Sequence, residues 1–244
     1  MNKNLMICIK NVWFTIIIYT LFGCSTESSE NTTNDNIQPI VKINYLALGD
    51  SYTKGEAVCD NCKFPSQLKD SLKNYINQNE LVNLKVIAQT GWTTTNLKTA
   101  INNENLSNEY DLVTLLIGVN NQYQNKPFSL YEQEFPELLN TSIQLAKGDL
   151  NRVIVVSIPD YAYTLFGQSG NEDFISNQID QYNLFAKNYA TSQGVTFVNI
   201  TDITRQGLEN PNLVAYDNLH PSELAYTKFV ERILPIAKEK LGIE

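Results

Sequence analysis

Five short apolar runs recur along the chain from residue 43 onward. They cover residues 43–48, 84–88, 112–117, 153–158 and 195–200, and they are rich in branched aliphatic side chains. Short runs of this composition are typical of strands buried on both faces of a parallel sheet. The pattern therefore predicts five buried strands.

Longer segments between these runs repeat apolar residues at helical spacing. They cover residues 66–79, 95–102, 131–147, 172–193 and 221–241. From Tyr226 to Leu241 the apolar residues recur every three or four positions, which is the spacing of one helix face. Each of these segments is predicted to form a helix.

Three prolines qualify the helix predictions. Pro221 fits the first turn of the last helix, where its missing N–H would have no partner in any case. Pro136 and Pro235 fall inside predicted helices, and we expect each to kink or interrupt its helix.

The alternation of strands with helices predicts an α/β domain. Such domains have a parallel sheet covered by helices on both faces, with right-handed crossover connections. Residues 40–244 contain no linker or repeat, so about 200 residues are expected to share one large core. Functional groups in such a sheet gather at the carboxyl ends of the strands.

Ser51 and His220 are the candidate chemical groups. Ser51 follows the first apolar run in a Gly-Asp-Ser turn, and His220 is the only histidine in the chain, three residues after Asp217. A serine hydroxyl needs a base to take its proton, and the base needs an anion to orient it. Asp217 is the first candidate for that anion because of its spacing, and Asp160 is a second.

Two further turns follow predicted strands. Gly91 comes shortly after the second run, and Gly118, Val119 and Asn120 follow the third. The ordered blocks around Ser51, Gly91, Asn120 and His220 resemble those of the SGNH hydrolases, also known as the GDSL esterase/lipase family. No block is specific alone, since Gly-Asp-Ser occurs in many ordinary turns, but all four stand in the family's order.

The resemblance implies a fold and a set of roles. The fold would be a three-layer, flavodoxin-like αβα arrangement. Ser51 would be the nucleophile, His220 the base and Asp217 its partner, while Ser51, Gly91 and Asn120 would form an oxyanion hole. Tyr52 and Asn121 depart from the family pattern, which usually has leucine and aspartate there.

The same resemblance implies a serine esterase that needs no metal or organic cofactor. Its substrate would be a small-molecule, lipid or carbohydrate ester, and Trp92, Tyr161, Tyr163 and Phe166 are candidate substrate-binding residues near the expected site. The alternative is a non-catalytic surface lipoprotein of the same fold that binds glycans or a partner.

The first 23 residues resemble a bacterial lipoprotein signal peptide. Lys3 and Lys10 precede an apolar run that is too short to span a bilayer, which takes about 20 residues. The segment ends before Cys24 in a sequence resembling a lipobox, so Cys24 is the expected lipidation site. The protein is then expected outside the cytoplasm, anchored to a bacterial membrane, with the outer membrane as the preferred location and surface exposure as a further option.

Residues 24–39 are expected to form a flexible acidic tether. Residues 25–36 contain no aromatic or aliphatic side chain, and such a composition cannot bury enough surface to order itself. This stretch resembles the export tag of some surface-displayed lipoproteins, but a plain spacer has the same composition. Removal of the two leader lysines would take the net charge from −8 to −10, which disfavours nucleic acid as a partner.

Cys59 and Cys62 are the only cysteines beyond Cys24. A zinc site would need further soft ligands, and the single histidine is already assigned. A local disulfide in an oxidising compartment is the simpler interpretation. It would shape the loop after Ser51, at the rim of the expected site.

Overall fold

The computed structural model describes residues 42–77 and 80–243, which belong to one compact unit. The predicted signal peptide, Cys24 and the tether lie outside the described residues. Among the helices within these ranges, none is both long and apolar enough to cross a membrane.

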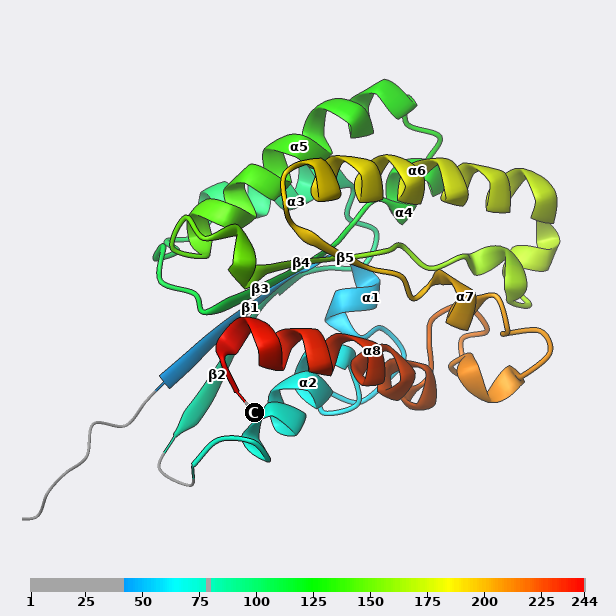
Figure 1. The fold of residues 1–244 in the computed structure, drawn as a ribbon. Coiled ribbons are helices and arrows are strands. Elements are labelled where there is room, and N and C mark those ends of the chain that lie inside the picture. The colour runs from blue at the N-terminus through cyan, green and yellow to red at the C-terminus, as the bar shows by residue number, and fades with distance from the viewer. Residues whose placement is uncertain (1–41, 78–79, 244) are drawn as a thin grey trace, which may run out of the picture. The chain divides into compact units, whose positions relative to one another are not determined.

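A five-stranded parallel sheet forms the centre of the domain (Figure 1). Its strands stand in the order β2-β1-β3-β4-β5, and every neighbouring pair is parallel. This order is the flavodoxin-like one, and it confirms the predicted fold class. The strands are β1 (Lys42–Gly49), β2 (Leu81–Ala88), β3 (Leu112–Leu116), β4 (Val153–Val156) and β5 (Thr196–Val198).

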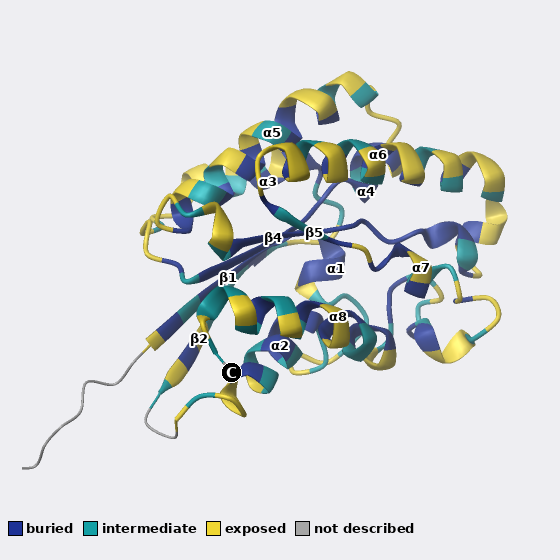
Figure 2. Ribbon diagram, viewed as in Figure 1, coloured by how far each residue is buried: buried dark blue, intermediate teal, exposed yellow. Residues whose placement is uncertain are grey.

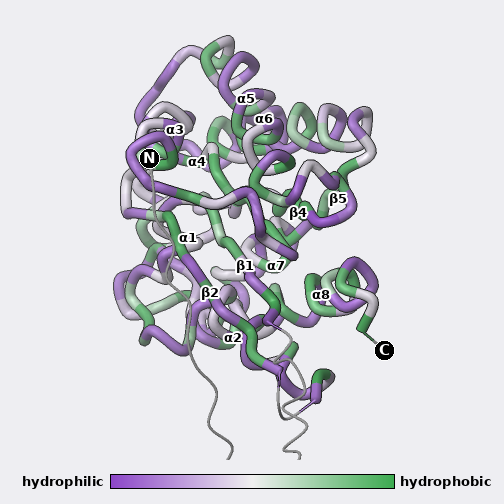
Figure 3. Tube along the Cα trace, turned by 90° about the vertical axis from the view of Figure 1, so that its left-hand side faces the viewer, coloured by the Kyte–Doolittle hydropathy of each residue, from purple (hydrophilic) through white to green (hydrophobic). Residues whose placement is uncertain are grey.

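Helices cover both faces of the sheet (Figure 1). On one face α5 packs against both α3 and α6, and on the other α2 packs against α8. Hydrophobic and hydrophilic residues alternate along α8, as expected for a helix with one buried face (Figure 3). The bounds are α2 (Phe64–Lys73), α3 (Thr94–Asn103), α5 (Phe128–Leu145), α6 (Glu172–Ser192) and α8 (Glu223–Leu241).

Burial differs between the middle and the edge of the sheet (Figure 2). Every residue of β3 and β4 is buried, whereas β2 has only two buried residues. β5 has one buried residue of three. The prediction of a buried strand is therefore wrong for β2 and β5. The reason is their place at the two edges of the sheet, where each has a neighbouring strand on one side only.

The prolines behave differently from the prediction. Pro136 and Pro235 lie inside continuous helices, so neither interrupts its helix. Each removes one backbone hydrogen bond, while the buried residues around it keep the helix packed on the sheet. Pro221 lies before α8 rather than in its first turn, because Ser222 caps the helix by accepting a hydrogen bond from the Ala225 N–H.

Three short helices follow strand ends and have no counterpart in the sequence prediction. They are α1 (Ser51–Lys54), α4 (Val119–Tyr123) and α7 (Thr201–Thr204). Segments of four or five residues are too short to show a helical period. The first two begin at the predicted functional blocks.

Candidate active site

Ser51 is the first residue of α1, directly after the carboxyl end of β1. Asp50 caps the helix, because its Oδ1 accepts a hydrogen bond from the Tyr52 N–H at 3.0 Å. Gly49 is needed at the end of β1 because a Cβ there would clash with the Leu116 carbonyl oxygen on β3 and with the Thr53 side chain on α1. The chain thus leaves the strand sharply and places the Ser51 side chain at the sheet edge.

His220 and Asp217 lie near the C-terminal end of the chain, and the fold brings them next to Ser51. The Ser51 Oγ lies 2.9 Å from His220 Nε2, and Asp217 Oδ2 lies 2.6 Å from His220 Nδ1. Asp217 Oδ1 accepts hydrogen bonds from the backbone N–H groups of Leu219 and His220, each at 3.0 Å. The three side chains therefore form one continuous hydrogen-bonded row.

The Asp217 carboxylate is held in its charged form. Burial alone would raise its pKa, but the hydrogen bonds from His220 and from the backbone outweigh burial and lower the pKa below its usual value. A lowered pKa means that this carboxylate is ionised wherever the domain is folded near neutral pH.

Asp160, the other candidate partner of His220, is engaged elsewhere. Its Oδ2 accepts hydrogen bonds from Arg205 Nε at 2.9 Å and from the Ser176 hydroxyl at 2.7 Å. Its Oδ1 accepts from the Ala162 N–H. Asp160 therefore anchors the segment after β4 and does not touch the imidazole.

Gly91 and Asn120 line the same pocket as Ser51. Gly91 has φ +82, in the left-handed region, and no atom lies near its missing Cβ. Asn120 Nδ2 donates to the Trp92 carbonyl at 3.1 Å, which leaves the second hydrogen of this amide free to point elsewhere. The structure thus brings together all five residues predicted for the triad and the oxyanion hole.

An aromatic pocket of about 190 Å³ opens beside these groups. Tyr161 and Phe166 line it, as predicted, together with Tyr123. Tyr123 was not predicted, although it stands three residues after Asn120, a spacing that puts two helical residues on one face. Its ring lies 5.8 Å from that of Tyr161 and 6.0 Å from that of Phe166, centroid to centroid. The other lining residues are Ser51, Tyr52, Thr90, Gly91, Val119, Asn120, Leu219 and His220.

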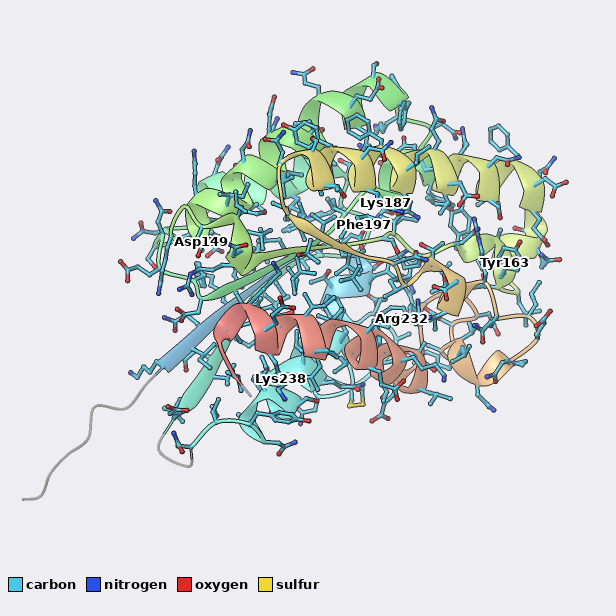
Figure 4. All side chains as sticks on the ribbon, in the orientation of Figure 1. Asp149, Tyr163, Lys187, Phe197, Arg232 and Lys238 are labelled. Carbon is cyan, nitrogen blue, oxygen red and sulfur yellow. A yellow bond between two sulfur atoms is a disulfide. The ribbon has the colours of Figure 1, made fainter. Side chains whose placement is uncertain are left out.

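Trp92 and Tyr163 are two predicted substrate-binding residues that do not line this pocket. Both are partly buried and pack against the hydrophobic core. Tyr163 lies at the end of the molecule that carries α7 (Figure 4). A role of these two residues in substrate binding therefore stays a prediction.

Tyr52 contacts the base. Its side chain is buried, and its ring centroid lies 5.3 Å from that of His220. The residue that departs from the usual leucine thus packs beside the imidazole, with its ring tilted by 55°.

A disulfide joins Cys59 and Cys62 in the loop after α1 (Figure 4). This loop begins after Lys54, the last residue of α1, and includes Glu56. The side chains of Lys54 and Glu56 contact Thr90 at the pocket wall. The disulfide therefore lies in the loop that borders the site.

Asp50 is a buried carboxyl group next to Ser51. No solvent reaches its side chain, and its Oδ2 has no hydrogen-bond partner among the described residues. Burial raises its pKa to about 7, although the hydrogen bond from Tyr52 opposes the rise. Asp50 is therefore mostly neutral below that pH.

We expect Asp50→Asn to stabilise the domain most at alkaline pH. A carboxyl group whose folded pKa exceeds its unfolded value of about 3.9 makes the domain less stable as pH rises from about 4 through about 7. Asparagine cannot ionise and can still cap the helix. Thermal denaturation at pH 5 and pH 8 should show a larger difference in Tm, variant minus wild type, at pH 8. An equal difference at both pH values would show that Asp50 does not titrate in the folded domain.

Comparison with known proteins identifies a family whose sequence model matches this chain. The sequence model of the GDSL-like lipase/acylhydrolase family matches residues 47–228, a span that includes Ser51, Gly91, Asn120, Asp217 and His220. No curated protein matches the chain.

Several solved structures share the fold. An acetylxylan esterase from Geobacillus stearothermophilus has a TM-score of 0.60 and 19% identity, over 84% of this chain and 96% of its own. An α/β hydrolase from the metagenome of Lake Arreo, Spain, has a TM-score of 0.61 and 19% identity, over 83% and 97%. A lipolytic G-D-S-L family protein from Veillonella parvula has a TM-score of 0.57 and 16% identity, over 79% and 97%.

Proposed function

Because the chain belongs to the GDSL-like lipase/acylhydrolase family, we propose that it is a serine esterase acting on carboxylic esters through Ser51, His220 and Asp217. The observation that carries the proposal is the hydrogen-bonded row from Ser51 Oγ through His220 to Asp217. A serine in such a row can lose its proton to the imidazole as it attacks a carbonyl carbon.

In the proposed reaction, Ser51 Oγ forms a bond to the ester carbonyl carbon while its proton moves to His220 Nε2. The carbonyl oxygen becomes an oxyanion, which the Ser51 and Gly91 N–H groups and the Asn120 amide would stabilise. His220 then gives its proton to the leaving alcohol, and the acyl group stays on Ser51. Water, deprotonated by His220, releases the carboxylic acid and regenerates the hydroxyl.

The pocket supports a small acyl group as the preferred substrate part. Pockets for drug-sized ligands measure roughly 300–1,000 Å³, whereas this one measures about 190 Å³ and is lined by Tyr123, Tyr161 and Phe166. The fold similarity to an acetylxylan esterase agrees with a short acyl ester on a carbohydrate. We therefore propose short-chain esters, with acetylated carbohydrates ahead of lipids.

A fluorophosphonate probe tests the proposal together with a series of nitrophenyl esters. The wild-type protein should form one adduct, located on Ser51 by mass spectrometry, and Ser51→Ala should form none. Turnover should be fastest on the shortest acyl chains. A folded protein that forms no adduct and hydrolyses no ester of the series would instead be the non-catalytic binding module.

We also propose that the protein is a lipoprotein anchored to a bacterial membrane through Cys24. The support is the leader sequence, in which two lysines and an apolar run precede this cysteine. Expressed in a bacterial host, the mature protein should begin at a lipidated Cys24 and partition into detergent, while Cys24→Ser should stay unprocessed or soluble. Intact-mass measurement decides between these outcomes, and a mature chain that begins at another residue would contradict the anchor.

A further inference from the structure

Asn121 connects the two segments that carry the proposed oxyanion donors. It is fully buried at the start of α4, next to Asn120, and it bonds twice to Thr94, the first residue of α3. Its Oδ1 accepts from the Thr94 N–H at 2.9 Å, and its Nδ2 donates to the Thr94 hydroxyl at 2.7 Å. Thr94 lies three residues after Gly91, so these bonds help to fix the distance between Gly91 and Asn120.

The direction of these hydrogen bonds is fixed by a buried carboxylate. The Thr94 hydroxyl accepts from Asn121 and donates its own hydrogen to Glu134 Oε2 at 2.6 Å. Glu134, on α5, is 5% exposed and also accepts from the Thr95 hydroxyl at 2.8 Å. Lys98 lies 3.5 Å from its Oε1. Negative charge in this network therefore resides on Glu134, and position 121 must supply a neutral donor.

We infer that Asn121 and Glu134 act together as positioning residues for the oxyanion hole, with the charge placed on Glu134 instead of position 121. This inference rests on the proposed esterase function. The inference follows from the hydrogen-bond directions, because a carboxylate at position 121 would compete with Glu134 for the single hydrogen of the Thr94 hydroxyl. Two buried carboxylates would then face each other across the Thr94 hydroxyl, which can donate to only one of them, and the start of α4 would move away from α3.

Exchange of the two groups should reverse both hydrogen bonds of the Thr94 hydroxyl and keep the bond from the Thr94 N–H to position 121. With Asn121→Asp and Glu134→Gln together, the Thr94 hydroxyl would donate to the new carboxylate and accept from the new amide nitrogen. The amide oxygen would face Lys98, and the exposed Thr95 hydroxyl can turn to water. The total charge would equal that of the wild type.

A double-mutant cycle tests the inference, with kcat and KM measured on a soluble short-chain ester. Asn121→Asp should lower kcat by about 10- to 100-fold, the scale of loss for a small misplacement of catalytic groups, with KM within about twofold. Glu134→Gln alone should lower kcat less, because its amide can turn its oxygen to Thr94. Added to Asn121→Asp, however, it should raise kcat at least about tenfold. A double variant no faster than Asn121→Asp would overturn the inference.

Glu137→Gln is the matched control for the charge. Glu137 lies one helical turn from Glu134 and also pairs with Lys98, but it is exposed, and neither its hydrogen bonds nor its ion pair involves Thr94. Added to Asn121→Asp, Glu137→Gln should not raise kcat. If it raised kcat as much as Glu134→Gln does, the loss of any nearby charge would suffice, and the inference would be overturned. A wild type without ester hydrolysis would instead refute the proposed function.

Thr94 gives a second route if Asn121→Asp does not fold. Thr94→Ser keeps the hydroxyl and should keep kcat within about threefold, while Thr94→Val keeps the shape, loses the hydroxyl and should lose about tenfold or more in kcat. Wild-type kcat in a folded Thr94→Val variant would overturn the inference as well.

Discussion

Ser51→Ala and His220→Ala should each lower kcat for ester hydrolysis by about four to six orders of magnitude. Ser51 forms the acyl bond, and His220 is the only imidazole in the chain, so no neighbouring histidine can replace it. The double variant should be hardly slower than either single variant, because nucleophile and base act as one unit. Initial rates on a short nitrophenyl ester measure the loss, and circular dichroism checks the fold.

Two results would contradict this expectation. A folded Ser51→Ala variant with near-normal turnover would show that another group is the nucleophile. Losses that multiply in the double variant would show that Ser51 and His220 work independently, despite the 2.9 Å between Ser51 Oγ and His220 Nε2.

Asp217→Asn should lower kcat by about 10⁴ with little change in Tm. The reason lies in the two backbone N–H groups that bond to Asp217 Oδ1. They would hold the asparagine oxygen in the same place and turn its NH₂ group toward His220 Nδ1. That nitrogen would then have to accept, so the proton would sit on Nε2, where it prevents the ring from taking the Ser51 proton.

Asp160→Asn is the comparison variant, since Asp160 is the other carboxylate considered for this role. It pairs with Arg205 and is fully buried, so its loss should lower Tm while kcat of the folded enzyme stays within a few-fold. Kinetics and thermal denaturation of both variants separate the two roles. The opposite pattern, with kcat lost in Asp160→Asn and kept in Asp217→Asn, would reassign the partner of His220.

The sheet could be predicted from short-range patterns, whereas the roles of the five central site residues came from the resemblance of their sequence blocks to those of the SGNH hydrolases. Apolar runs identify the strands, and parallel strands bring their carboxyl ends to one edge, where Ser51, Gly91 and Asn120 follow. Because the chain has one histidine, His220 was the only candidate for an imidazole base. Strand burial was harder, because it depends on which strand lies at the sheet edge, and the runs contain no information on strand order.

Contacts between distant segments could not be predicted in the same way. Thr94 and Glu134 are 40 residues apart, and no spacing along the chain relates them. The aromatic pocket was predicted in part, since Tyr161 and Phe166 follow a strand, but Tyr123 lies on a helix too short to be recognised. The prolines show that packing of a helix on the sheet can outweigh a local preference against helix.

The nucleophile and the base stand 169 residues apart, near opposite ends of the described domain. Ser51 enters the site from the first strand, and His220 just before the last helix, which packs beside α2. During synthesis the serine emerges early, but its base emerges only when nearly the whole domain has been made. A chain cut short before residue 220 would contain the residues of all five strands but no base. Hydrolysis of esters therefore requires the two ends of the domain to be brought together, and a partly made chain would be inactive.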